Sequence, residues 1–180
     1  MDILTSDFQQ DFFQLFNLPA VFEIDNSTLE RNFLALQAQV HPDKFTHLSE
    51  AERRLSMQWA TRVNEGYQTL RNPLNRARYL LLQNGVDTQE ESNTAMPVDF
   101  LMQQMEWREA LEAARQEKSS SALEGLEQRM QREVRILQQQ LVTDIDDTRD
   151  YAAASGIVRK LKFLEKLAEE IGSAFDELDS

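Results

Sequence analysis

The chain has 180 residues, with 19 Lys and Arg against 31 Asp and Glu, a formal net charge of −12 and no cysteine. The lack of cysteine excludes disulfides, thiol catalysis and cysteine-ligated metal sites, and the acidic balance argues against nucleic acid or an anionic membrane surface as a partner. No apolar run is long enough to cross a bilayer, and the N-terminus lacks the basic and apolar start of a signal peptide. We therefore expect a cytoplasmic protein.

The composition favours helices. Glycine (5) and proline (4) are scarce. The charge is uneven along the chain, with a net −2 in residues 1–84 and −10 in residues 85–180. We interpret most of the acidic half as a solvated face that keeps the chain soluble.

The N-terminal half predicts a helical hairpin that follows a short apolar segment at residues 12–19. Two sets of apolar residues repeat at three- and four-residue spacing, which places each set on one helix face. They are Leu29, Phe33, Leu36 and Val40, and then Leu55, Trp59, Val63, Tyr67 and Leu70. Capping-box patterns at 27–30 and 49–52 predict the two helix starts, with Asp25 as a rival cap for the first.

The tripeptide His41-Pro42-Asp43 lies between these two helices. Pro42 disfavours helical geometry for His41 and removes a backbone donor, so the first helix should end there. The loop then presents one imidazole and one carboxylate at the exposed tip of the hairpin, which suits docking onto a partner. The alternative is a helical hairpin in which the tripeptide is incidental, so the flanking context has to decide.

Further helices are expected downstream. Asn72-Pro73 predicts a cap and the first residue of a fourth helix that runs to about Leu82 and ends at Asn84-Gly85. Residues 85–96 have the composition of a polar linker. After Pro97 the pattern is helical, and breaks at residues 118–121 and 143–147 predict three helices.

The first helix after the linker carries apolar residues on two opposed sides. One side contains Phe100, Trp107, Ala110, Leu111 and Ala114, and the other contains Val98, Leu101, Met102 and Met105. A three-helix bundle buries only one broad face of each helix well, so we expect the Phe-Trp-Leu side in the core and the Leu-Met-Met side exposed as an interaction site, beside Glu106, Glu109 and Glu112. The alternative is that both sides are buried.

The last helix predicts a core stripe from which Phe163 departs. The stripe contains Ile157, Leu161, Leu164, Ala168, Ile171, Phe175 and Leu178. Phe163 is then either a stray surface aromatic or an extension of the exposed patch on residues 101–105.

These patterns resemble two known families. Residues 11–80 resemble the J-domain of DnaJ-class co-chaperones, through His41-Pro42-Asp43 followed by Lys44-Phe45, residues 64–70 and Asn72-Pro73. The strings at 100–109 and 158–164 extend the resemblance to the HscB family over nearly the whole chain. The resemblance implies an all-α fold with an N-terminal J-domain helical hairpin and a C-terminal three-helix bundle. The expected division is an extension at 1–10, a J-domain at 11–84, a linker at 85–96 and a client-binding domain at 97–180.

The HscB family works in iron–sulfur cluster biogenesis, so the resemblance implies two partners. These are an HscA-type chaperone ATPase, which the chain would stimulate, and an IscU-type scaffold protein, which it would deliver. The chaperone-binding residues would be His41, Pro42, Asp43, Lys44 and Arg31. The scaffold-binding residues would be Leu101, Met102, Met105, Glu106, Glu109 and Phe163. The absence of a cysteine-rich segment favours a bacterial-type member, and we expect a monomer that binds no cofactor or metal.

The chain departs from the family pattern before the tripeptide, where the second helix carries only Arg31. Positive charge near the loop must then come from Lys44, Arg53, Arg54 and Arg62, and residues 1–10 have no assigned counterpart. We expect no enzyme activity, because both histidines, His41 and His47, lie in one exposed loop without a water-excluded pocket. Two alternatives remain, namely a J-protein with a different client and a helical adaptor without a chaperone role.

Overall fold

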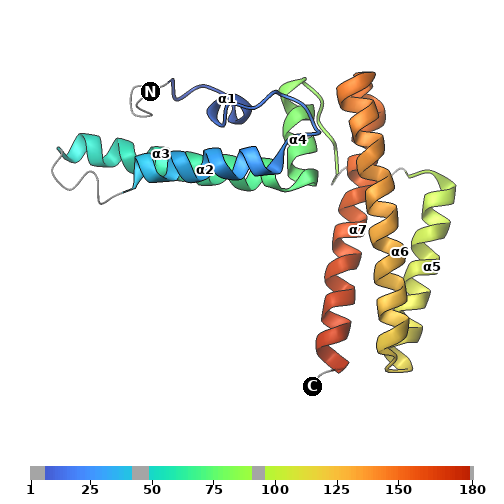
Figure 1. Ribbon diagram of the computed structural model, residues 1–180. Coiled ribbons are helices and arrows are strands. Elements are labelled where there is room, and N and C mark those ends of the chain that lie inside the picture. Colours follow the sequence, from blue (N-terminus) through green and yellow to red (C-terminus); the bar gives the residue numbers. More distant parts are fainter. Residues whose placement is uncertain (1–6, 42–48, 91–95, 179–180) are drawn as a thin grey trace. The chain divides into compact units, whose positions relative to one another are not determined.

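The computed structural model describes residues 7–41, 49–90 and 96–178, and every regular element in these ranges is helical. The elements in chain order are α1 Phe12–Leu15, α2 Asn26–Val40, α3 Glu50–Arg71, α4 Pro73–Gln83, α5 Val98–Gln116, α6 Ser120–Leu141, the π-helix η3 Val142–Asp147 and α7 Tyr151–Leu178 (Figure 1). The predicted all-α class is therefore confirmed. None of the described helices is long and apolar enough to cross a membrane.

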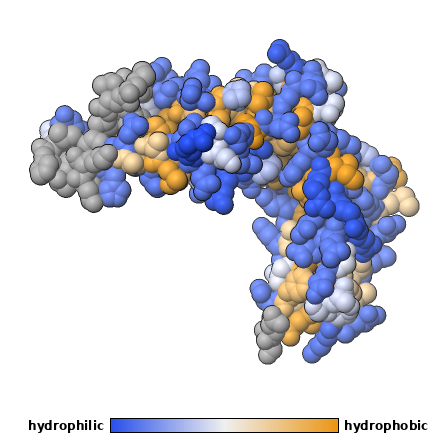
Figure 2. Space-filling view, viewed as in Figure 1, coloured by the Kyte–Doolittle hydropathy of each residue, from blue (hydrophilic) through white to orange (hydrophobic). Residues whose placement is uncertain are grey.

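The chain divides into two compact units, Met1–Leu80 and Leu81–Ser180. The boundary falls inside α4, and each unit has its own apolar core. Hydrophilic residues cover most of the face shown in Figure 2, and hydrophobic residues form separate patches on it. The domain limits expected from the sequence, including the client-binding role of residues 97–180, stay predictions.

In the first unit, α2 and α3 lie side by side as the expected hairpin (Figure 1). The N-cap of α2 is Asp25, whose carboxylate accepts the Ser27 amide at 3.0 Å, so the capping box expected at Ser27 is wrong and the rival cap is used. The cap of α3 is the expected one, because Ser49 and Glu52 bond reciprocally to each other's backbone amides. The hydrogen bonds to Ser49 hold the pKa of Glu52 below its usual value.

The apolar face of this hairpin is covered by α1. Phe12, Phe13 and Phe16 are buried, and the Phe12 ring stacks on Tyr79 at 4.8 Å between centroids. This close approach is possible because α3 carries Gly66, where a Cβ would lie 2.8 Å from the Phe12 ring and 2.9 Å from the Phe16 ring. The expected stripes of α2 and α3 face this core, with four of their members half-buried rather than buried, namely Phe33, Leu36, Leu55 and Tyr67.

The second unit is a bundle of α5, α6 and α7, which run side by side (Figure 1). The break expected at residues 143–147 is not a loop. Instead, α6 continues into the π-helix η3, and the chain turns at residues 148–150. Asp150 then accepts the Ala153 amide at 3.0 Å at the start of α7.

The expected core stripe of α7 is correct at Ile157, Leu161, Leu164 and Ile171 and wrong toward the C-terminus. Ala168 is exposed and Leu167 is buried in its place, because leucine buries more apolar surface than alanine at the turn where the two positions compete. Nearer the C-terminus Ala174 is buried, whereas Phe175 and Leu178, which were expected in the core, are half-buried.

Part of the expected linker packs on the bundle. The Thr88 carbonyl accepts hydrogen bonds from the Arg159 guanidinium at 3.1 Å and from the Ser155 hydroxyl at 3.4 Å, both on α7. These bonds pair the carbonyl of the half-buried Thr88 with donors on α7. The stretch around Thr88 is therefore part of the second unit and not a free connector.

Candidate functional site

The first candidate site lies where α2 ends. His41 is the C-cap residue of α2, with extended backbone angles of φ −62° and ψ 130°, and it is exposed. The helix therefore ends where the following proline was expected to stop it. The other residues of the expected loop site, Pro42, Asp43 and Lys44, lie outside the described residues.

A residue that the sequence analysis missed fixes this helix end. The buried Ser56 hydroxyl on α3 donates to the Val40 carbonyl at 3.1 Å, one residue before His41. The bond satisfies one of the carbonyls that a helix C-terminus leaves without an intrahelical donor. Its signal in the sequence is the spacing of Ser56, Trp59 and Val63, which places a polar residue on the buried stripe of α3.

Two basic residues of the first unit, Arg31 and Arg62, lie away from this end of α2. Arg31 lies ten residues before His41, roughly 15 Å away along the helix, and donates to the Thr28 hydroxyl at 2.8 Å. Arg62 is held elsewhere, because its guanidinium lies about 5 Å from the rings of Phe8 and Phe12 and bonds to the backbone of residue 10. Arg31 and Arg62 are thus placed by local contacts, and neither is brought to His41.

Residues 8–10, which belong to the segment without an assigned role, pack on α3. The Phe8 ring meets the buried Trp59 edge-on at 4.8 Å between centroids. Together with the contacts of Arg62, this places residues 8–10 against the core of the first unit. The described part of the N-terminal segment is therefore integral to that unit.

The second candidate site is the outer face of α5. Leu101, Met102 and Met105 have exposed fractions of 41%, 60% and 63%, whereas Phe100 and Trp107 are 3% and 4% exposed. The expected exposure of the Leu-Met-Met side is confirmed, and the alternative with both sides buried is wrong. The acidic residues expected beside this side, Glu106 and Glu109, are also exposed.

Phe163 departs from its expected exposure, since it is half-buried. Its ring lies edge-on to Phe100 at 5.9 Å and parallel to Trp107 at 6.5 Å between centroids, and the Arg108 guanidinium lies over it at 5.5 Å. The reason is the packing of α7 against α5, which the helical periodicity of α7 alone does not reveal. Phe163 thus belongs partly to the core of the bundle and partly to its surface.

The exposed side of Phe163 opens into a groove of about 650 Å³ between α5 and α7. Its lining residues are Glu90, Met96, Leu101, Gln104, Arg108, Arg159, Lys162, Phe163, Glu165, Lys166 and Glu169. The groove therefore brings Leu101 and Phe163 together, although the two residues are far apart in the sequence. We call it the α5–α7 groove.

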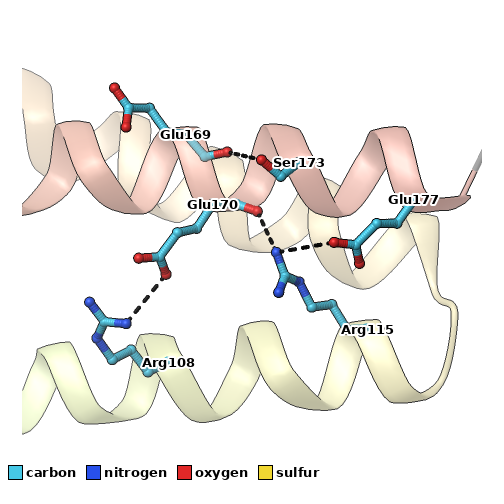
Figure 3. A network of polar contacts seen from close by, with 6 residues as sticks. All are labelled: Arg108, Arg115, Glu169, Glu170, Ser173 and Glu177. Carbon is cyan, nitrogen blue, oxygen red and sulfur yellow. Dashed lines mark hydrogen bonds and ion pairs between the residues drawn. The ribbon is translucent and has the colours of Figure 1, made fainter.

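Two arginines on α5 fix its distance from α7 (Figure 3). Arg108 pairs with the Glu170 carboxylate at 3.3 Å, and Arg115 donates to the Glu170 carbonyl at 3.1 Å and lies 3.7 Å from the Glu177 carboxylate. Exposed ion pairs contribute little stability singly, so their main effect here is geometric. Arg108, which also lines the α5–α7 groove, thereby ties the α5 wall of the groove to α7.

A second hollow, of about 500 Å³, lies on the opposite side of α5. Asp99, Glu106 and Glu133 line it together with Lys160, whose ammonium lies 5.3 Å from the centre of the Phe100 ring. Within the described ranges, no group of His, Asp and Glu has the arrangement of a metal site.

Comparison with known proteins agrees with both units. A family model described as the HSCB C-terminal oligomerisation domain matches residues 96–172. Curated relatives named co-chaperone protein HscB homolog align with this chain over almost their full length. The relative from Aromatoleum aromaticum is 50% identical, covering 98% of this chain and 100% of its own, and that from Chromobacterium violaceum is 54% identical, covering 97% and 99%. The chain belongs to the HscB family of co-chaperones.

Solved structures of HscB proteins have the same fold. Chaperone HscB from Vibrio cholerae matches with a TM-score of 0.82 and 37% identity, covering 94% of this chain and 99% of that one. Human co-chaperone HscB matches with a TM-score of 0.86 and 29% identity, covering 93% and 83%. The predicted family and the predicted arrangement of a helical hairpin and a three-helix bundle are therefore confirmed, and the HscB relatives are co-chaperones rather than enzymes.

Proposed function

We propose that this HscB-family chain binds an IscU-type iron–sulfur scaffold protein, delivers it to an HscA-type chaperone and stimulates the ATPase of that chaperone. The chain itself contributes binding and orientation, and ATP hydrolysis takes place on the partner. The scaffold-binding residues are Leu101, Met102, Met105, Glu106, Glu109 and Phe163. The chaperone-binding residues are His41, Pro42, Asp43, Lys44 and Arg31.

The exposed apolar stripe on α5 is the observation that carries the proposal. The core of the bundle is complete on the opposite side of the helix, where Phe100, Trp107 and Leu111 are buried. The stripe therefore has no part in holding the bundle together, and exposing it to water is unfavourable unless a partner covers it. Methionine side chains are flexible and polarizable, which suits a surface that adapts to a partner.

The acidic residues beside the stripe add specificity. Glu106 and Glu109 would meet a basic region of the scaffold, which sets the orientation of the complex and its association rate more than its affinity. The apolar residues would supply most of the binding energy, because a few well-packed anchors usually dominate an interface.

The end of α2 supplies the second contact. His41 is exposed at the helix end, and Ser56 holds the preceding backbone in place. In the family mechanism the aspartate of the tripeptide contacts the ATPase domain and the linker of the chaperone while the client is presented, and hydrolysis then traps the client. Since Arg31 is the only basic residue of α2 and lies ten residues before His41, we expect weaker electrostatic steering toward an acidic ATPase surface than a basic α2 would give.

One assay tests the proposal. The ATPase rate of an HscA-type chaperone is measured in single turnover with this chain alone, with an IscU-type scaffold alone and with both. We expect modest stimulation by each and a larger-than-additive stimulation by both. Stimulation without any effect of the scaffold would favour a J-protein with another client, and no stimulation at all would favour a helical adaptor.

A further inference from the structure

The α7 wall of the α5–α7 groove carries two lysines that the proposed scaffold contacts do not use. Lys162 and Lys166 lie one helical turn apart, on the same side of α7, and both line the groove with Phe163. Neither side chain has a hydrogen bond or an ion pair with another described residue. Both ammonium groups are therefore open to a partner that enters the groove.

The two arginines of the same groove are already engaged. Arg108 pairs with Glu170, and Arg159 donates to the Thr88 carbonyl. These bonds hold the arginines in the framework of the bundle, where they keep α5 and the segment around Thr88 against α7. The recognition of an incoming negative charge thus falls to Lys162 and Lys166.

The lysines place positive charge on the side of the stripe that lies opposite Glu106. Around α5, Glu106 lies on the side away from the groove, beyond Met102, and Glu109 lies among the residues of the stripe. The surface therefore passes from an acidic edge at Glu106, across the apolar stripe, to a groove in which two lysines without a described partner lie among three glutamates. A complementary partner needs basic residues on one side of its apolar anchor and acidic residues on the other.

We propose that the α5–α7 groove is part of the scaffold-binding surface and that it receives an acidic segment of the scaffold protein, paired with Lys162 and Lys166. The inference rests on the proposed function, because the groove is continuous with the apolar stripe through Leu101 and Phe163. Charge complementarity selects the occupant. Glu90, Glu165 and Glu169 also line the groove, so it fits a segment with one or two carboxylates placed at the lysines rather than a uniformly acidic one.

The lysine pair should act mainly on the orientation and the rate of association. Charges at the rim of an interface typically change the association rate and its salt dependence. Since Glu106 and the two lysines lie on opposite sides of the stripe, they allow only one direction of the scaffold across the surface. The scaffold then recognises the positions of the charged residues on the two sides of the stripe, and not the net charge of the chain.

The test compares three double variants of the full-length chain. Lys162→Glu with Lys166→Glu reverses the proposed contact. Arg129→Glu with Arg132→Glu is the matched control, because it makes the same change of net charge on the exposed outer face of α6. Glu106→Lys with Lys162→Glu leaves the net charge unchanged and exchanges the charges on the two sides of the stripe. Association rates and dissociation constants for a purified IscU-type scaffold are measured by surface plasmon resonance at low and high salt.

At low salt we expect the lysine reversal to slow association about tenfold and the α6 control to slow it less than about twofold. The charge-exchange variant should also bind more weakly than the unchanged chain, and high salt should reduce all of these differences. Equal effects of the lysine reversal and the α6 control, or normal binding by the charge-exchange variant, would overturn the inference while scaffold binding itself stands. Failure of the unchanged chain to bind the scaffold would instead overturn the proposed function. Melting curves identify any variant that has lost its fold, and alanine at both lysines then replaces the reversal.

Discussion

The two candidate sites are built in different ways. The residues at the end of α2 follow one another in the sequence, and the structure adds support from a distant residue, Ser56. The surface on the bundle combines residues 101–109 of α5 with residues 162–166 of α7, and it exists only because those two helices pack together. The first site therefore depends on where a helix ends, whereas the second depends on the relative position of two helices.

The largest effect is expected at the end of α2. Replacing His41 by Gln or Asp43 by Asn should abolish the stimulation of an HscA-type ATPase, because these side chains are proposed to make the direct contact with the chaperone. The helical content by circular dichroism and the affinity for the scaffold should stay unchanged. Normal stimulation by either variant would show that the tripeptide is incidental.

The second prediction separates binding from stability within α5. Leu101→Ala and Met105→Ala should each weaken scaffold binding by about tenfold or more and change the stability by less than about 0.5 kcal/mol. Trp107→Ala should cost about 3–5 kcal/mol of stability, because it removes a buried ring from the bundle. Isothermal titration and thermal unfolding measure the two quantities.

Phe163→Ala sharpens this comparison, since Phe163 contributes to both sides. We expect a loss of binding together with a destabilisation of roughly 1–3 kcal/mol, which combines lost contacts to Phe100 and Trp107 with lost burial. A variant that binds poorly but melts as the unchanged chain would mean that its contacts with those two rings contribute no stability.

The third prediction tests how tightly α1 packs on the hairpin. Gly66→Ala should destabilise the first unit by about 1–3 kcal/mol, because the added methyl group would lie under 3.0 Å from the rings of Phe12 and Phe16. Gly125→Ala on α6 is the matched control, since nothing lies within 4 Å of the added Cβ and alanine favours a helix by about 0.5–1 kcal/mol. Chemical denaturation should show opposite signs for the two variants.

The fourth prediction concerns the support of the helix end. Ser56→Ala removes the bond to the Val40 carbonyl, which should cost about 1–2 kcal/mol and leave the end of α2 less well fixed. ATPase stimulation should fall partially, by a few-fold, while scaffold binding is unaffected. Full stimulation by a destabilised Ser56→Ala chain would show that this bond serves the fold alone.

The smallest effect is expected in the π-helix. Burial, and secondarily the nearby Asp150, raise the pKa of Asp144 above its usual 3.8. The folded chain therefore holds the Asp144 proton more tightly than the unfolded chain, so this group favours folding below pH 3.8 and loses that contribution as the pH rises through the raised pKa. Asp144→Asn should then increase the melting temperature slightly at pH 7, and the gain should vanish at low pH. Asp147→Asn, at an exposed position of the same π-helix, should give a smaller change.

Several features could be predicted from the sequence because their causes are local. Helix starts at Ser49 and Asn72-Pro73, the end of α2 before a proline and the end of α4 at Gly85 depend on neighbouring residues only. The two faces of α5 could be separated because its apolar residues fall into opposed groups with different sizes. The same reasoning gave the wrong register for the end of α7, where Leu167 and Ala168 compete and only the packing against α6 decides.

The sequence by itself determined the all-helical class, the position of His41 at a helix end and the exposed stripe on α5, since each depends on helical periodicity or on local backbone chemistry. Only the tertiary structure decided that Ser56 fixes the end of α2 and that Arg62 contacts residues 8–10. The same holds for the half-buried position of Phe163 and for the groove that Lys162 and Lys166 line together with Leu101. These features depend on contacts between residues far apart in the chain, and such contacts are set by the packing of whole helices rather than by the residues next to them.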